Sequence, residues 1–294
     1  MEFSSICWNI TSHCNENCLF CYRDLEDKDS SLERNKAIMR NLIQNGVGKI
    51  SFVGGEPLLY KELFDLVEYG RSLDSAVQFS ITTNAILLVT FDDNGFVLNE
   101  ELLNRIINVF DWICFPLDAP NEQTQTKMGR NIHHLKRIQV LLEYIRSSKC
   151  NIRIKINTVV SDINIDFLID LNKLLEKYEI DRWKLFKFLP SRGIALLNRS
   201  KFEINEEKYK ENINELLTIS KIRISYNKQY DYLKTYITIT SSGFLSVYDG
   251  KCYSNVIDMA TANSTRVFDF VDHEMHKKRR SDYLSINNRE DLYI

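Results

Sequence analysis

Residues 4–22 read SSICWNITSHCNENCLFCY, and this stretch determines how the rest of the chain is interpreted. Its first part, Ser4–Ile10, is a short run rich in apolar residues that predicts a β-strand. Cys14, Cys18 and Cys21 follow it, so we expect three thiols in the loop at the carboxyl end of that strand. In parallel α/β proteins, functional groups gather at this end of the strands.

The next part of the chain repeats this arrangement, with short β-rich runs separated by amphipathic helical stretches. Further strands are expected at Lys49–Val53, Val77–Thr82, Trp112–Leu117, Ile152–Val159 and Trp183–Phe188. Helices are expected at Leu32–Asn45, Tyr60–Ser72, Glu100–Val109, His133–Ser147 and Ile165–Tyr178. Short apolar strands joined by helices predict an α/β fold with parallel pairing and right-handed crossovers. Six such units are too few for a closed eight-stranded barrel, so a partial open barrel and a doubly wound sheet both fit.

The pattern changes after residue 190. A helix over Glu206–Ser220 is followed by short strands at Ile222–Tyr226 and Tyr236–Thr240. We therefore expect a core over residues 1–190 and a small C-terminal α+β extension over residues 191–294 that covers it. The basic run HKKRR at 276–280 is interpreted as a solvated helix face rather than a nucleic-acid patch.

Composition restricts the possible classes of protein. The chain has 294 residues, of which 44% are hydrophobic and 27% charged, as is typical of a globular protein with a full-sized core. A net charge of -2 predicts no nucleic-acid partner and no attraction to anionic membranes. We find neither an apolar run of about 20 residues nor a secretory signal, and expect a cytoplasmic protein without membrane partners.

The three clustered cysteines need a chemical explanation. Disulfides are a poor one, because the expected compartment is reducing and the total of seven cysteines is odd. The spacing C-x3-C-x2-C places three thiolates where they can converge on one soft metal centre. Structural zinc usually takes four ligands, and no second C-x2-C occurs. An iron–sulfur cubane on three cysteines would leave one iron open to a substrate or cosubstrate.

This motif resembles that of the radical S-adenosylmethionine superfamily, including the aromatic residue Phe20 before the last cysteine. The resemblance implies that Cys14, Cys18 and Cys21 hold a [4Fe–4S] cluster, whose open iron is chelated by S-adenosyl-L-methionine. One electron from the cluster, supplied by a donor such as a flavodoxin or ferredoxin, then yields a 5′-deoxyadenosyl radical. It also implies a partial (βα)6 barrel.

Further residues that the resemblance assigns to the cofactor follow the second, third and fourth strands. The sequence GGEP after the second strand is similar to the superfamily motif that binds the methionine amino group, and a carboxylate suits an ammonium. The residues of this motif are Gly54, Gly55, Glu56 and Pro57. A contact with the cofactor is also implied for Phe20, and polar contacts to S-adenosylmethionine for Ser80, Asn84, Asp118 and Arg130.

The fifth and sixth strands carry a second signal. Arg153, Lys155 and Asn157 alternate along one strand, and Arg182 and Lys184 share a face of the next, with Lys187 off that face. Cations gathered on an inward face are costly without anions to pair them. An anionic substrate such as a polyphosphate explains them, and so do ordinary salt bridges with the chain's own carboxylates.

Around Lys155–Val160 and Arg182–Phe186 the chain resembles the viperin-like branch of the superfamily, which acts in antiviral defence. There the matching residues bind a nucleoside triphosphate, which is dehydrated to a 3′-deoxy-3′,4′-didehydro nucleotide; Lys155, Asn157, Arg182 and Lys184 are thereby implied as substrate ligands. Modification of a ribosomal peptide or of a sugar-like metabolite is an alternative. A zinc-stabilised binding module is the alternative that is not an enzyme. No catalytic acid or base is assigned.

Overall fold

The computed structural model describes residues 5–226, 234, 236–251 and 253–276. The chain forms two compact units. Unit 1 comprises Met1–Cys14, Arg23–Thr82 and Lys228–Ile294, and unit 2 comprises Asn15–Tyr22 and Thr83–Asn227. Across the described residues, no helix is both long and apolar enough to cross a membrane.

Unit 1 is built on a mixed sheet with the strand order β12-β11-β10-β1-β2-β3. Strands β10, β1, β2 and β3 run parallel, whereas β11 and β12 are antiparallel to their neighbours. The strands are β1 (Ile6–Thr11), β2 (Lys49–Gly54), β3 (Gln78–Thr82), β10 (Thr238–Ile239), β11 (Phe244–Tyr248) and β12 (Tyr253–Asp258). The helices are α1 (Leu32–Gln44), η1 (Pro57–Leu59), α2 (Leu63–Leu73) and α10 (Ser264–Phe268).

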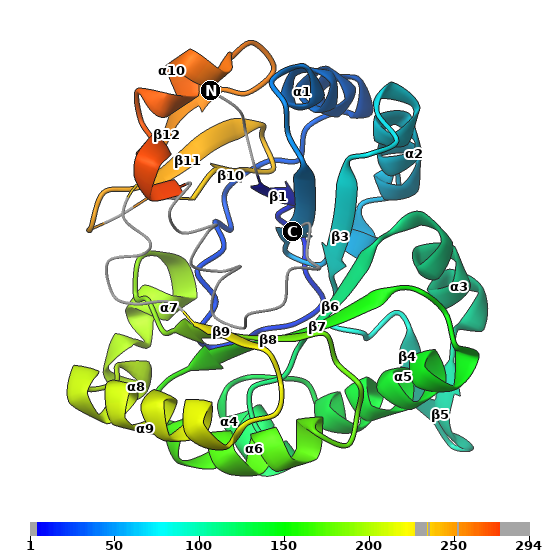
Figure 1. Ribbon diagram of the computed structural model, residues 1–294, viewed down its shortest axis with the longest axis vertical. Helices are drawn as coiled ribbons and strands as arrows, with labels where there is room; N and C mark the ends of the chain where they lie inside the picture. The colour runs from blue at the N-terminus through cyan, green and yellow to red at the C-terminus, as the bar shows by residue number, and fades with distance from the viewer. Residues whose placement is uncertain (1–4, 227–233, 235, 252, 277–294) are drawn as a thin grey trace. The chain divides into compact units, whose positions relative to one another are not determined.

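The core of unit 1 lies between its parallel strands and the helices α1 and α2, which Figure 1 shows side by side. Trp8, Phe52 and Phe79 come from three adjacent strands and are fully buried. Their rings stack, with centroids 5.8 Å apart for the first pair and 6.2 Å for the second. Aromatic stacking on one face leaves the opposite face, which includes Ser51 and Ser80, for polar side chains.

Unit 2 is built on the parallel sheet β6-β7-β8-β9. Its strands are β6 (Trp112–Pro116), β7 (Arg153–Val160), β8 (Arg182–Lys187) and β9 (Ile224–Tyr226), beside a separate hairpin of β4 (Val89–Asp92) and β5 (Gly95–Leu98). Its helices are α3 (Glu100–Val109), α4 (Glu122–Lys127), α5 (His134–Ser148), η2 (Ile165–Phe167), α6 (Leu168–Leu175), α7 (Gly193–Leu197), α8 (Arg199–Phe202) and α9 (Glu206–Ile219). Helices α5, α6 and α9 lie on the same side of the sheet (Figure 1).

The helix-covered face of this sheet is mainly apolar, and the buried polar groups on it described here have hydrogen-bond partners. Along β7 every second residue is buried against the helices, including Ile156 and Thr158. Trp183 of β8 is also fully buried, and its Nε1 donates to Thr158 Oγ1 at 2.9 Å. The alternate residues of the same strands therefore point to the opposite face, which carries the polar side chains discussed below.

The predicted α/β class is confirmed. All six core strands lie where the sequence places them, within one or two residues, and α3 coincides with its prediction. The stretch expected as a helix from Tyr60 begins with a turn that follows η1, so α2 starts at Leu63. The stretch expected from Ile165 begins with the 3-10 turn η2, so α6 starts at Leu168.

The hairpin β4–β5 was not predicted, although Asn94-Gly95 is a strong turn signal, because its strands are short and pair only with each other. Residues after 190 add β9 to unit 2 and β10 to β12 to unit 1. That the residues after 190 cover the core remains a prediction. Most of the basic run at 276–280 lies outside the described residues.

Candidate functional site

In unit 1, the GGEP segment packs tightly against the residues that lead into Cys14. The N–H of Gly55 donates to Thr11 O at 2.8 Å, and the N–H of Glu56 donates to His13 O at 2.7 Å. A Cβ on Gly55 would lie only 1.8 Å from His13 O, so only glycine permits this approach. The motif thus fixes the backbone immediately before the first cysteine.

The Glu56 carboxylate is almost completely buried, and its Oε1 accepts from the N–H of Leu58 at 3.2 Å, which caps η1. Pro57 occupies the first position of that turn. Ser80 lies on β3 and donates to Ser51 Oγ at 2.8 Å. Unit 1 therefore places a carboxylate just beyond the carboxyl end of β2 and two hydroxyls midway along β2 and β3.

Asp29 is a unit 1 residue that the sequence reasoning missed. Its carboxylate accepts from the N–H of Ser12 at 2.8 Å and from the hydroxyl of Thr11, and it lies 3.2 Å from His13 Nδ1. Asp29 is thereby a second anchor for the segment before Cys14. A lone aspartate in a polar loop has no sequence signal that distinguishes it from the acidic residues around it.

In unit 2, the loop with Cys18 and Cys21 is held by backbone contacts from two other segments. The N–H of Leu19 donates to Met128 O at 3.0 Å, and Cys21 O accepts from the N–H of Ala195 at 2.9 Å. Gly129 has φ +88°, and a Cβ there would lie 2.6 Å from Leu19 N. The loop is therefore seated on the backbone of the α4–α5 connection.

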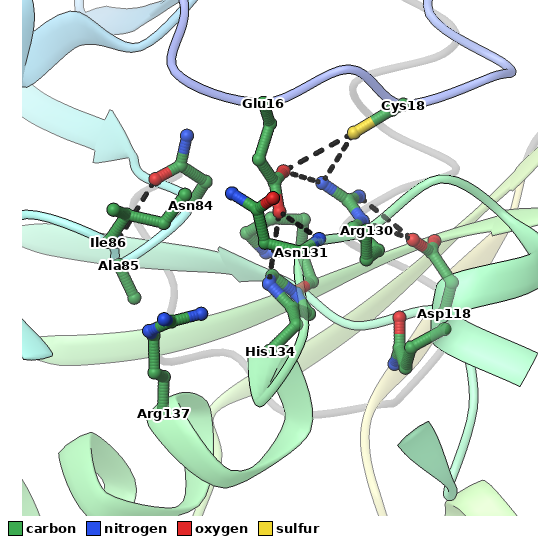
Figure 2. Close-up of polar contacts among 12 residues, drawn as sticks. Glu16, Cys18, Asn84, Ala85, Ile86, Asp118, Arg130, Asn131, His134 and Arg137 are labelled. Carbon is green, nitrogen blue, oxygen red and sulfur yellow. Dashed lines mark hydrogen bonds and ion pairs between the residues drawn. The ribbon is translucent and has the colours of Figure 1, made fainter. Parts of the chain in front are cut away.

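Arg130 is the centre of a buried ionic network in unit 2, drawn in Figure 2. Its Nε donates to Asp118 Oδ2 at 2.8 Å, and its Nη1 donates to Glu16 Oε2 at 2.8 Å. The same Nη1 lies 3.2 Å from Cys18 Sγ. The guanidinium also stands over the ring of Phe20, 5.0 Å from its centroid. Arg130 thus joins the cysteine loop to the segment that follows β6.

Glu16, the only charged residue between the first and last clustered cysteines, is the main partner in this network. Its Oε1 accepts from the N–H of Asn131 at 3.3 Å and lies 3.4 Å from His134 Nδ1. Burial alone would raise the pKa of Glu16, but the charge of Arg130 and the contact with His134 outweigh it and hold that pKa well below its ordinary value. The carboxylate is therefore ionised inside the protein.

Cys18 lies within the same network. Its thiol donates to Glu16 Oε2 at 3.3 Å. Burial raises the pKa of the Cys18 thiol well above its ordinary value, although the charge of Arg130 acts in the opposite direction. Coordination to a metal deprotonates a thiol outright and would reverse this balance.

Besides Arg130, three predicted cofactor residues have structural partners in unit 2. Asp118 is buried, and its second oxygen accepts from the N–H of Val159 at 2.8 Å. Phe20 belongs to an apolar cluster with Met128 and Phe202. Asn84 donates to Asn15 Oδ1 at 2.7 Å. Phe20 belongs to the cysteine loop itself, Asn84 contacts it through Asn15, and Asp118 is joined to it through Arg130; contact of these residues with a cofactor remains a prediction.

The face of the unit 2 sheet opposite the helices brings the predicted substrate residues together. The strand register pairs Lys155 with Arg182 and Asn157 with Lys184. Directly paired residues of parallel strands point to the same face, so these four side chains form one polar surface. Lys187, which is off this phase, instead forms an ion pair with Glu206 of α9. The predicted alternation, which places the polar side chains of β7 and β8 on one face, is confirmed.

The model of the Radical SAM superfamily matches residues 8–175, which is more than half of the chain. The chain belongs to the radical SAM superfamily. The match includes all three clustered cysteines, the GGEP segment and Arg130. The protein is accordingly an enzyme.

Among its relatives is an S-adenosylmethionine-dependent nucleotide dehydratase of Flammeovirga pacifica, 29% identical over 81% of this chain and 80% of the relative. A protein of the same name from Selenomonas ruminantium is 26% identical over 89% of this chain and 92% of its own length. A solved structure of Streptococcus suis SuiB bound to precursor peptide SuiA covers 96% of this chain and 67% of its own, with a TM-score of 0.70 and 15% identity. That likeness concerns the fold.

The cofactors of this radical SAM protein are S-adenosylmethionine and the [4Fe–4S] cluster that characterises the family. Among the described residues, no three His, Cys, Asp or Glu side chains are grouped around a metal position. The donor set nevertheless fits a cluster: Cys18 and Cys21 share one turn, in which the N–H of Cys21 donates to Cys18 O at 3.1 Å. The surrounding apolar residues and Arg130 suit an anionic iron–sulfur centre.

Proposed function

We propose that this radical SAM enzyme acts on a nucleoside triphosphate and dehydrates it to a 3′-deoxy-3′,4′-didehydro nucleotide. The observation that carries the proposal is the cationic surface of β7 and β8, where Lys155, Arg182 and Lys184 share one face. Arg182 and Lys184 are at least nine-tenths buried. Buried cations of this density match a polyanion, because each phosphate oxygen accepts charge-assisted hydrogen bonds.

The relatives support the same assignment. Two proteins named S-adenosylmethionine-dependent nucleotide dehydratase align with more than four-fifths of this chain. The resemblance noted between their branch and the segments around Lys155 and Arg182 concerns the same surface.

We assign these residues separate roles in the proposed reaction. Cys14, Cys18 and Cys21 would hold the cluster, and Gly54, Gly55 and Glu56 would receive the amino group of S-adenosylmethionine. The bound cofactors supply a 5′-deoxyadenosyl radical that abstracts a hydrogen atom from the substrate. Lys155, Arg182 and Lys184 would fix the phosphates, so that the ribose lies toward the carboxyl ends of the strands.

The proposed reaction balances with two electrons and one proton. The abstracted hydrogen leaves in 5′-deoxyadenosine, the ribose 3′-hydroxyl leaves as water after taking up a proton, and one electron reduces the remaining sugar radical. The other electron cleaves the sulfonium. A one-electron donor of the flavodoxin or ferredoxin class would supply both.

Anaerobic turnover tests the proposal. The reconstituted protein, reduced with dithionite, is incubated with S-adenosylmethionine and each of ATP, GTP, CTP and UTP. We expect one triphosphate to raise 5′-deoxyadenosine formation and to appear by mass spectrometry as a product lacking one water. Equal 5′-deoxyadenosine formation with and without every triphosphate would contradict the proposed substrate class.

A further inference from the structure

A third strand extends the polar surface of unit 2. The register that pairs Asn157 with Lys184 also pairs Lys184 with Ser225 of β9. Asn157, Lys184 and Ser225 therefore form one row across three parallel strands, on the face opposite the helices. Ile224 and Tyr226 point the other way, since neighbours along a strand alternate. The position of Ser225 in this row follows only from the pairing of β9 with β8.

The Ser225 hydroxyl has an unusual environment. Its residue is only 5% exposed, and its Oγ has no hydrogen-bond partner within the part of the chain that the structure describes. Oδ1 of Asn157, at the other end of the row, also lacks one there. On the opposite face, Thr158 Oγ1 is satisfied by Leu117 O and Trp183 Nε1. A buried polar atom without a partner calls for an explanation, and two such atoms in one row beside Lys184 are explained by a ligand that binds there.

The chemistry of the row indicates which ligand is missing. Lys184 stands in the middle of the row, and Arg182 and Lys155 form the next row toward the amino ends of the strands. A hydroxyl beside clustered cations can rotate to donate to an anionic oxygen. Ser225 lies on β9, one strand spacing (about 5 Å) beyond Lys184 and two spacings (about 10 Å) from β7, so a single phosphate held between the cations of β7 and β8 is centred more than one spacing away from it.

We propose that Ser225 donates a hydrogen bond to the phosphate chain of the nucleotide and thereby favours a triphosphate over a monophosphate. The inference rests on the proposed function. A monophosphate at the cationic centre would leave the β9 end of the row unfilled, whereas a longer phosphate chain spans it. Ser225 is then a specificity-determining residue of the substrate site that takes no part in forming the radical.

Direct binding measurements test this role without turnover. Isothermal titration calorimetry on the full chain, loaded with cluster and S-adenosylmethionine, gives Kd values for the tightest-binding of the four common nucleoside triphosphates and for its monophosphate. Ser225→Ala should weaken triphosphate binding by about tenfold and change monophosphate binding less than about twofold. Ile224→Val, on the other face of the same strand, should change neither Kd.

The outcomes separate the two proposals. Unchanged triphosphate binding in Ser225→Ala overturns the role of Ser225 and leaves the proposed function intact. Equal weakening of both nucleotides also overturns it, because the contact would then not discriminate. If the wild-type protein binds none of the nucleotides, the proposed function fails and the inference fails with it. Should Ser225→Ala not fold, Ser225→Cys, of similar shape but a poor donor, is judged by the same criteria.

Discussion

Glu16 accepts a 2.8 Å hydrogen bond from Arg130 across 114 residues of sequence. Both side chains are at least nine-tenths buried, and Asp118 takes the other edge of the guanidinium at 2.8 Å. Two carboxylates and one guanidinium sum to a charge of −1, so both buried carboxylates depend on the same cation. The contact joins the cysteine loop to the α4–α5 connection, so the loop's stability depends on a residue far from it in sequence.

Removal of Arg130 should therefore be strongly destabilising. Arg130→Ala leaves Glu16 and Asp118 buried without a counterion, and we expect the free energy of unfolding to fall by about 3–5 kcal/mol. Chemical denaturation of the protein checks this value. Arg199→Ala breaks an exposed pair with Glu203 and should change stability little. Similar losses in both variants would show that the network has no special role.

The three clustered cysteines should each be required for the cluster. Cys14→Ala, Cys18→Ala and Cys21→Ala are expected to lose most bound iron and the associated visible absorbance after anaerobic reconstitution, and to stop cleaving S-adenosylmethionine. Cys150→Ala, whose sulfur lies 3.9 Å from Ile145 O and outside the clustered motif, should retain iron. Normal iron content in all three cluster variants would refute the assignment.

Lys184 and Lys187 lie on the same strand but on opposite faces, which gives a matched pair for the substrate surface. Lys184→Ala should weaken nucleoside triphosphate binding by about tenfold or more, because a charged contact is lost, while uncoupled cleavage of S-adenosylmethionine persists. Lys187→Ala removes the ion pair with Glu206 and should leave nucleotide affinity unchanged. Calorimetric titration distinguishes the two, and equal effects would argue against a face-specific site.

Gly129 should tolerate no side chain. Gly129→Ala must adopt φ +88° and would bring a Cβ to 2.6 Å from Leu19 N, so we expect a lower thermal midpoint and reduced cluster incorporation. Gly95 also has a positive φ, +108°, but a Cβ there meets nothing within 4 Å of the described atoms. Gly95→Ala therefore measures backbone strain alone. If it lowers the thermal midpoint and the cluster incorporation as much as Gly129→Ala does, the contact of residue 129 with Leu19 is not the cause.

Asp27 should give unit 1 an acid-sensitive stability. Burial would raise the pKa of Asp27, but hydrogen bonds from Ser242 and Ser241 outweigh it and lower that pKa below the ordinary 3.8. A depressed pKa contributes stability above about 3.8, and this is lost as pH falls through the lower, folded value. Asp27→Asn should thus be less stable than wild type at pH 7, and the difference should shrink below about pH 3.8. Denaturation curves across pH test this, and a stability difference that does not shrink below about pH 3.8 would contradict it.

The sequence was most informative where a signal is local. The C-x3-C-x2-C spacing, the glycines of GGEP and the alternation of Lys155 with Asn157 each depend on neighbours a few residues apart, and the fold class followed from the repeated order of strands and helices. Strand periodicity alone separated Lys184 from Lys187, because successive side chains must point to opposite faces.

Tertiary structure decided everything that depends on partners distant in sequence. Nothing local marks Glu16 as the ion-pair partner of Arg130, and nothing marks Ser225 as the neighbour of Lys184, because a three-residue strand acquires its place only by pairing with β8. The same applies to Arg130 itself: a sequence reveals a guanidinium, but only the packed chain shows that two of the protein's own carboxylates already neutralise it. Charge balance and hydrogen-bond satisfaction belong to the folded interior, where water no longer competes.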